Sequence, residues 1–150
     1  MTTVWRPRGH IRVIALGLHW RAGRLLAAEV RDDAGRLKGV RPLGGGVDFG
    51  ETAAAALQRE FMEELDVEIA IAGAPMVMEN IYHHEGATGH EIAFLYPVSL
   101  PEGAFAAQER IQFREDDGTP GCAGWYDPAE LDLPEGPALF PAGLKHLLRG

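Results

Sequence analysis

The run from Gly45 to Val67, GGVDFGETAAAALQREFMEELDV, constrains this chain more than any other part of its sequence. Residues Thr52 to Leu65 are mainly Ala, Leu, Gln, Arg, Glu and Met, with no proline or glycine, which predicts a helix. The glycines at positions 44 to 46 come before this segment and indicate a turn. We therefore expect a glycine turn followed by an amphipathic helix.

Acidic residues border the apolar side of the expected helix. The apolar seam consists of Ala54, Leu57, Phe61 and Leu65. Glu60, Glu63 and Glu64 are spaced i, i+3 and i+4, so they project from a single side next to that seam. Like charges at this spacing repel each other, and acids in the last turn oppose the helix dipole. A Mg²⁺ or Mn²⁺ ion would turn this repulsion into coordination, whereas a solvated acidic face is the ordinary alternative.

The glycines, Glu51 and Arg59 favour the metal over the solvated face, because their spacing completes the pattern G-x5-E-x7-R-E-U-x-E-E-x-G-U, with U a bulky aliphatic residue. The matching positions are Gly45, Glu51, Arg59, Glu60, Glu63, Glu64 and Val67. In this respect the chain resembles the Nudix hydrolases, and the resemblance covers about residues 10 to 148. Phe61 replaces an aliphatic residue, and Asp66 replaces a glycine at the helix end, where Asp tolerates a left-handed backbone.

The remaining pattern is one of short strands and turns. Strands are expected over 11–20, 24–30, 40–43, 67–72, 75–83, 90–100, 111–115 and 121–126, with a turn DDGTPG between the last two, a loop over 127–141 and a short helix over 141–148. Many strands around one helix indicate an α+β domain. The resemblance implies a Nudix-type α/β/α sandwich with a mixed β-sheet and one central catalytic helix, in a single domain over residues 1–150.

The resemblance implies a metal-dependent pyrophosphohydrolase. Hydrolysis of a diphosphate requires charge neutralisation, an aligned water molecule and a group that removes its proton. We hypothesise that Glu60, Glu64 and the carbonyl group of Gly44 bind Mg²⁺ or Mn²⁺, and that Glu63 is a third ligand or the base. Glu51 would position the cluster through Arg59 or a metal-bound water molecule.

Further candidates lie around this cluster. Gly45, Gly46, Arg41, Tyr82 and Trp125 are the predicted substrate-binding residues, although large aromatic side chains are usually part of the core. An additional acid often assists in this family, and the candidates are Glu91, which we prefer, Glu109 and Glu115. His83, His84 and His90 are expected on a solvent-facing loop tip and not in a zinc site, because they lack ligand spacing.

The expected substrate is a nucleoside diphosphate linked to another moiety, or a nucleoside triphosphate. One alternative is a non-catalytic nucleotide-sensing Nudix domain, which would typically have lost box carboxylates, and all are present here. Another is a prenyl diphosphate isomerase, which would require a reactive cysteine, and Cys122 is the only cysteine of the chain.

The formal net charge of −8 argues against a nucleic-acid polymer as partner but not against a small phosphorylated substrate. The sequence has no long apolar stretch or leader-like segment, so we expect no membrane association. A lone cysteine fits a reducing compartment, and the predicted location is the cytoplasm. A homodimer is possible, with residues 93–100 as an apolar interface strand.

Overall fold

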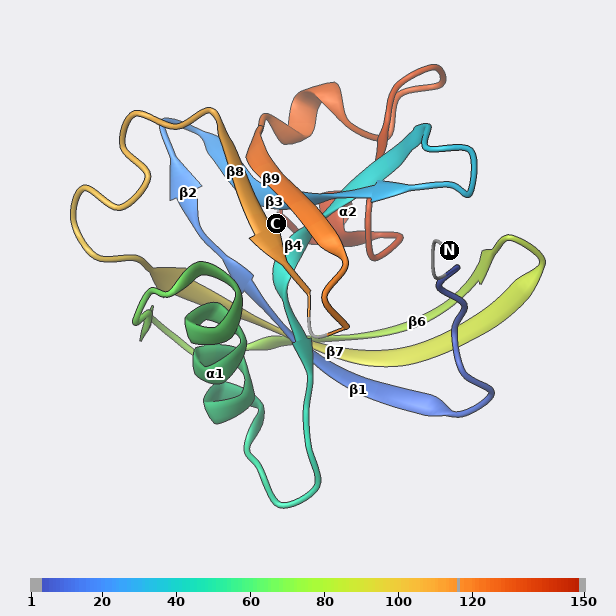
Figure 1. Cartoon of the computed structure of the whole chain (residues 1–150), viewed down its shortest axis with the longest axis horizontal. Coiled ribbons are helices and arrows are strands. Elements are labelled where there is room, and N and C mark those ends of the chain that lie inside the picture. The colour runs from blue at the N-terminus through green and yellow to red at the C-terminus, as the bar shows by residue number, and fades with distance from the viewer. Residues whose placement is uncertain (1–3, 116, 149–150) are drawn as a thin grey trace.

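The structure is a computed structural model, and it describes residues 4–115 and 117–148. The strands are β1 (Ile11–Leu18), β2 (Trp20–Arg21), β3 (Arg24–Arg31), β4 (Leu37–Gly46), β5 (Ala70–Ile71), β6 (Met76–His84), β7 (Ala87–Ser99), β8 (Arg110–Arg114), β9 (Pro120–Tyr126) and β10 (Ala138–Leu139). The helices are α1 (Ala53–Leu65), a 3-10 turn η1 (Pro128–Glu130) and α2 (Leu144–Leu148). Figure 1 shows α1 beside the curved strands. This mixed sheet with one main helix confirms the predicted α+β class.

The strands form a mixed sheet in the order β5-β7-β1-β4-β3-β9-β8, with β6 added to β7, β2 to β3 and β10 to β4. Strands β1 and β7 run parallel, and so do β4 and β10, whereas the other pairs are antiparallel. Strand β4 links the two halves of the sheet, because its first part pairs with β3 and residues Leu43–Gly46 pair with β1. The end of β4 therefore leads from the sheet centre directly toward α1.

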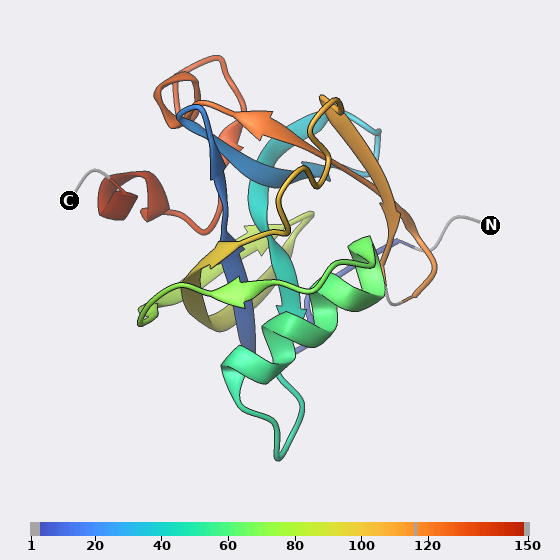
Figure 2. The same ribbon diagram turned by 90° about the vertical axis from the view of Figure 1, so that its left-hand side faces the viewer.

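Alternating side chains give the sheet two apolar faces. On one face, Leu57 and Phe61 of α1 pack with residues such as Ala15 of β1 and Leu26 of β3. On the other, Leu144 of α2 packs in a cluster that includes Ile14, Leu16, Leu25 and Ala27 from the same strands. Figure 2 shows α1 in front of the strands and α2 well separated from it. The α/β/α layering is thus built from one long helix and a short C-terminal segment.

The sequence of α1 explains both of its ends. Thr52 caps the N-terminus, where its hydroxyl group accepts a hydrogen bond of 3.1 Å from the backbone N–H of Ala55. Asp66 ends the helix in the left-handed conformation at φ 54°, as its tolerance for that region predicted. Phe61 is accommodated because Gly17 lies against its ring, where a Cβ atom on Gly17 would be 2.9 Å from Cε2.

Two structural predictions were wrong. Residues 44–46 are not a turn but the end of β4, because their backbone pairs with β1. Residues 93–100 cannot serve as a free interface, because β7 is paired on both sides and Ala93 and Leu95 are fully buried. Part of the predicted DDGTPG turn, Asp116, lies outside the described residues. Within the described chain, no helix is both long and apolar enough to cross a membrane.

Candidate functional site

The carboxylate of Glu60 lies beneath the end of β4. Glu60 is only 2% exposed, which is rare for an ionisable side chain. A Cβ atom on Gly45 would be 2.4 Å from Cδ and 2.6 Å from Oε1 of Glu60. Glycine at position 45 therefore makes room for a buried carboxylate, which any larger residue would displace.

Arg59 ties this carboxylate to its neighbours. Its guanidinium group donates two hydrogen bonds to Glu51, of 2.8 Å from Nε and 2.9 Å from Nη2. It also donates from Nη1 to Oε1 of Glu60 at 3.0 Å and from Nη2 to the carbonyl group of Gly46 at 3.0 Å. One arginine thus joins the loop before α1, the end of β4 and the buried acid, as planar bidentate geometry allows.

Glu51 anchors this arrangement from the other end. Its Oε1 atom accepts a hydrogen bond of 3.1 Å from the backbone N–H of Asp48, which fixes the loop between β4 and α1. The hydrogen bonds from Arg59, followed by that from Asp48, lower the pKa of Glu51 to about 2. Glu51 is therefore a fixed negative charge that orients Arg59.

Glu64 stands next to Glu60 in a poorly hydrated position. Burial, followed by the negative charge of Glu60, raises the pKa of Glu64 to about 8, and the positive charge of Arg41 opposes the increase. A side-chain hydrogen bond between the two carboxyl groups also favours the protonated form. The pair therefore holds a proton that a divalent cation can replace.

Glu63 differs from these two acids, because its side chain is 48% exposed. Its carboxylate accepts a hydrogen bond of 3.4 Å from Nη1 of Arg59, one turn earlier in α1. The three glutamates therefore do not share one environment, since they range from fully buried to solvent-facing.

The donor set fits a divalent metal. Two adjacent carboxyl groups that compete for one proton supply the hard oxygen ligands that Mg²⁺ and Mn²⁺ prefer. Within the described residues, no three His, Cys, Asp or Glu side chains already stand in a ligating arrangement. Glu60 and Glu64 differ from Glu51 and Glu63 because their carboxyl groups lie together in a poorly hydrated position, which makes this pair the candidate ligand set for the ion.

The sequence of the chain matches a known protein family. The family model for the NUDIX domain matches residues 9–147, nearly the whole chain. The chain belongs to the Nudix family. It is accordingly a Nudix hydrolase, an enzyme that acts on phosphorus-containing anhydrides, and members of this family generally use divalent metals and small phosphorylated substrates. The segment Gly45–Val67 is its Nudix box.

Solved structures share the fold. The chain is similar to a MutT NUDIX hydrolase from Burkholderia pseudomallei, with 25% identity, a TM-score of 0.59 and coverage of 91% of this chain and 95% of that one. The ORF135 protein of E. coli has 21% identity and a TM-score of 0.54, with coverage of 93% and 91%. A NUDIX hydrolase from Nitrosomonas europaea has 17% identity and a TM-score of 0.51, with coverage of 83% and 75%. A search of the curated proteins finds no significant match.

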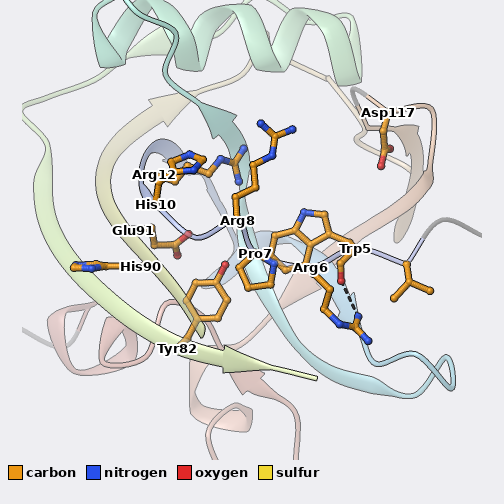
Figure 3. Close-up of a pocket in the computed structure, with 11 residues that line it drawn as sticks. Trp5, Arg6, Pro7, Arg8, His10, Arg12, Tyr82, His90, Glu91 and Asp117 are labelled. Atoms are coloured by element: carbon orange, nitrogen blue, oxygen red, sulfur yellow. Dashed lines mark hydrogen bonds between the residues drawn. The ribbon is translucent and has the colours of Figure 1, made fainter. Parts of the chain in front are cut away.

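Two cavities that share part of their lining lie at or near the Nudix box. The first, of about 990 Å³, is lined by Gly46, Arg59, Glu60 and Glu63 of the box and by Phe49 of the loop before α1. The second, of about 390 Å³, lies between the N-terminal segment and strands β6 and β7 (Figure 3). Arg8, His10 and Arg12 line both cavities. Sequence reasoning missed these basic residues, because nothing in the segment RPRGHIR marks it as part of a site.

The predicted substrate-binding residues differ in how close they lie to the two cavities. Tyr82 lines the second cavity, where burial and then the charge of Glu91 raise its pKa. Arg41 is close enough to Glu64 and Tyr82 for its charge to lower the pKa of each. Trp125 lines neither cavity, so its assignment to a substrate wall stays a prediction that this geometry does not support. Its side chain is buried in the core against α1, and its Nε1 donates to the carbonyl group of Gln108 at 3.0 Å.

The three candidates for the additional acid lie in different places. Glu91 lies in the second cavity, where it accepts a hydrogen bond of 3.3 Å from Nδ2 of Asn80. Glu109 forms an exposed ion pair with Arg24 at 3.3 Å, away from the box. Glu115, at the end of β8, is the one whose charge raises the pKa of Glu64. Of the three acids, Glu115 is thus the one whose charge acts on a carboxyl group of the box, whereas Glu91 lines the second cavity.

The histidines are not on a loop tip, and that prediction was wrong. His83 and His84 belong to β6 and His90 to β7, where His90 faces Glu79 at 3.0 Å. His84 is buried, because the ring of Trp5 lies against it with centroids 5.4 Å apart. Cys122 lies in β9 and lines neither cavity, which removes the feature that an isomerase would need.

Proposed function

We propose that this Nudix enzyme is a Mg²⁺-dependent pyrophosphohydrolase that cleaves a diphosphate bond in a nucleoside diphosphate linked to another moiety or in a nucleoside triphosphate. One observation carries the proposal: Glu60 is buried under Gly45 and in contact with Glu64, whose pKa is raised to about 8. Two acidic side chains placed together in a poorly hydrated site are costly for the fold. Their position is explained far better by binding of a cation than by a structural role.

Each box residue has a role in this proposal. Glu60 and Glu64, with the carbonyl group of Gly44, hold the ion, which when bound would neutralise charge on the diphosphate oxygens. Gly45 makes room for Glu60 and Gly46 for Arg12, so these two glycines let the side chains that hold the ion and the substrate lie close to the backbone of β4. Glu63 is exposed in the larger cavity, so it is placed either to accept a proton from the attacking water or to complete the ligand set.

Arg59 and Glu51 are positioning residues in the same proposal. The low pKa of Glu51 keeps it ionised at any physiological pH, so Arg59 stays aligned with Glu60. The net charge of −8 supports a small phosphorylated substrate over a nucleic-acid polymer, and the single cysteine supports action in the cytoplasm.

The test is a panel of nucleotides and nucleotide sugars with Mg²⁺, in which a phosphatase converts the products to measurable phosphate. We expect at least one member to be hydrolysed, and Glu64→Gln to reduce kcat by about 100-fold or more without loss of fold. Glu68→Gln is the matched control, because Glu68 is exposed just beyond α1. Wild-type turnover by Glu64→Gln would refute the assignment.

A further inference from the structure

Most arginines of the described chain donate hydrogen bonds to carboxylates or to backbone carbonyl groups. They are Arg6, Arg21, Arg24, Arg31, Arg36, Arg59, Arg110 and Arg114. Arg8, Arg12 and Arg41 are the exceptions, since none forms a hydrogen bond or ion pair with another residue in the ranges 4–115 and 117–148. Arg8 and Arg12 line both cavities beside the box, and Arg41 is close enough to Glu64 and Tyr82 for its charge to lower the pKa of each. In a protein of net charge −8, cations gathered without protein partners indicate an anionic ligand.

The N-terminal segment is held in a way that presents two of these arginines. Arg6 binds both carboxylate oxygens of Asp33 in the turn between β3 and β4. Trp5 packs on His84, whose Nδ1 lies 3.0 Å from Nζ of Lys38. The segment is therefore anchored through Trp5 and Arg6, whereas Arg8 stays available at the cavity.

Arg12 lies directly beside the Nudix box. A Cβ atom on Gly46 would be 3.1 Å from Nη2 of Arg12, so the guanidinium group covers the end of β4. The positive charge of Arg12 also lowers the pKa of Tyr82, which places the same side chain near the smaller cavity. Arg12 thus stands between the box and that cavity.

The smaller cavity has the lining of a nucleoside site. Figure 3 shows Arg8 and Arg12 on its side toward α1, with the hydroxyl group of Tyr82 pointing inward from β6. The ring of Trp5 is 48% exposed, so part of it is accessible to a ligand. Glu91, a hydrogen-bond acceptor that repels phosphate, suits ribose hydroxyl or base N–H groups. A volume of about 390 Å³ lies in the range of small-molecule sites.

The order of these groups gives the substrate its orientation. Along the surface, the box acids come first, then Arg8 and Arg12, then the cavity of Trp5, Tyr82 and Glu91. We propose that Arg8 and Arg12 bind the phosphate attached to the nucleoside, and that the cavity under the N-terminal segment holds the nucleoside itself. This inference rests on the proposed function, because it assigns the metal-bound phosphate to the box.

The test measures binding of α,β-methylene diphosphates of adenosine, guanosine, cytidine and uridine, whose bridging carbon prevents cleavage, by calorimetry with Mg²⁺. We expect at least one to bind, and Arg8→Gln and Arg12→Gln each to weaken it by about tenfold or more, since each removes a charge-assisted hydrogen bond. Arg24→Gln is the matched control, because Arg24 is exposed and lines neither cavity. Equal binding by the two variants and wild type would overturn the proposal.

Two further measurements test the metal site and the nucleoside cavity separately. Mn²⁺ affinity should not fall in Arg8→Gln or Arg12→Gln, because each removes a positive charge, so a failure of the metal site would be seen independently of nucleotide binding. Trp5→Ala should weaken the methylene nucleotide but not tripolyphosphate, which has no nucleoside, and Tyr82→Leu is a second variant if thermal denaturation shows that the first is unfolded. Equal weakening of both ligands, or of neither, would contradict a nucleoside in this cavity. Absence of any nucleotide binding while Mn²⁺ binds would overturn the inference but leave the metal assignment standing.

Discussion

Gly45 determines how closely β4 can approach Glu60. We predict that Gly45→Ala moves the buried carboxylate, because the added Cβ atom would be 2.4 Å from Cδ of Glu60. The expected cost is about 1–3 kcal/mol in the free energy of unfolding, with loss of Mn²⁺ binding. Chemical denaturation and metal titration measure the two effects. Gly9→Ala is the control, since nothing lies within 4 Å of its Cβ position, and comparable losses in both variants would contradict this explanation.

The raised pKa of Glu64 predicts how the metal-free protein responds to pH. Its folded-state pKa of about 8 exceeds the usual 4.5, so between these values the folded state binds more protons than the unfolded state. Stability should therefore fall as the pH rises from about 4.5 to 8. Added Mg²⁺ should stabilise more strongly at the upper end, where fewer protons compete for the carboxyl group. Thermal denaturation across this range measures the slope, which Glu64→Gln should flatten; an unchanged slope in the variant would contradict it.

At the residue scale, the sequence predicted the box more completely than its surroundings. The spacing of the box led to the expectation that Glu51 acts through Arg59, and the two side chains are hydrogen-bonded. Arg8 and Arg12 could not be found in this way, since only the fold brings the N-terminal segment over β6 and β7. The burial of Trp125 in the core could not be predicted either, because sequence alone cannot tell a core indole from an exposed one.

At the element scale, Asp66 offers a direct test of the end of α1. Its left-handed conformation is easier for glycine, and a negative charge there opposes the helix dipole. We predict that Asp66→Gly raises the free energy of unfolding by about 0.5–1 kcal/mol and leaves turnover unchanged. Asp66→Ala should instead lower it, because alanine keeps the strain. Urea denaturation of both variants checks the prediction, and a stabilised alanine variant would contradict it.

The elements were predictable where one pattern dominated. Helix α1 was clear because strong helix formers, an N-cap and an apolar seam all agree. The end of β4 was not predictable, because three successive glycines usually indicate a turn. Here the glycines allow other parts of the chain, distant in sequence, to lie close to the backbone of β4. Gly44 is an example, since a Cβ atom there would be 1.9 Å from the carbonyl oxygen of Ala15 in β1.

At the scale of the whole molecule, α2 is expected to stabilise the face of the sheet that α1 does not cover. Leu144 is fully buried in that core, whereas Leu147 in the same helix is 40% exposed. We predict that Leu144→Ala costs about 2–5 kcal/mol and that Leu147→Ala costs less than about 1 kcal/mol. Guanidinium denaturation compares the two, and metal affinity should be unaffected in both. An equal loss in the free energy of unfolding in the two variants would contradict a stabilising role for the packing of Leu144 in this core.

The whole fold follows from two apolar faces and one acidic helix, which is why its class was predictable. The mixed order of the strands was not, because pairing of β1 with β7 joins distant segments that no local pattern connects. That the chain is a single domain, and that it forms a homodimer, remain predictions.

The central claim is that Glu60 and Glu64 together bind a divalent cation, and calorimetric titration with Mn²⁺ at a pH above 8 tests it most directly. We expect saturable binding by the wild type and by Glu68→Gln, and a loss of affinity of about 100-fold or more in Glu60→Gln and in Glu64→Gln. Wild-type affinity in either of these two variants, or no binding by the folded wild type, would contradict the claim.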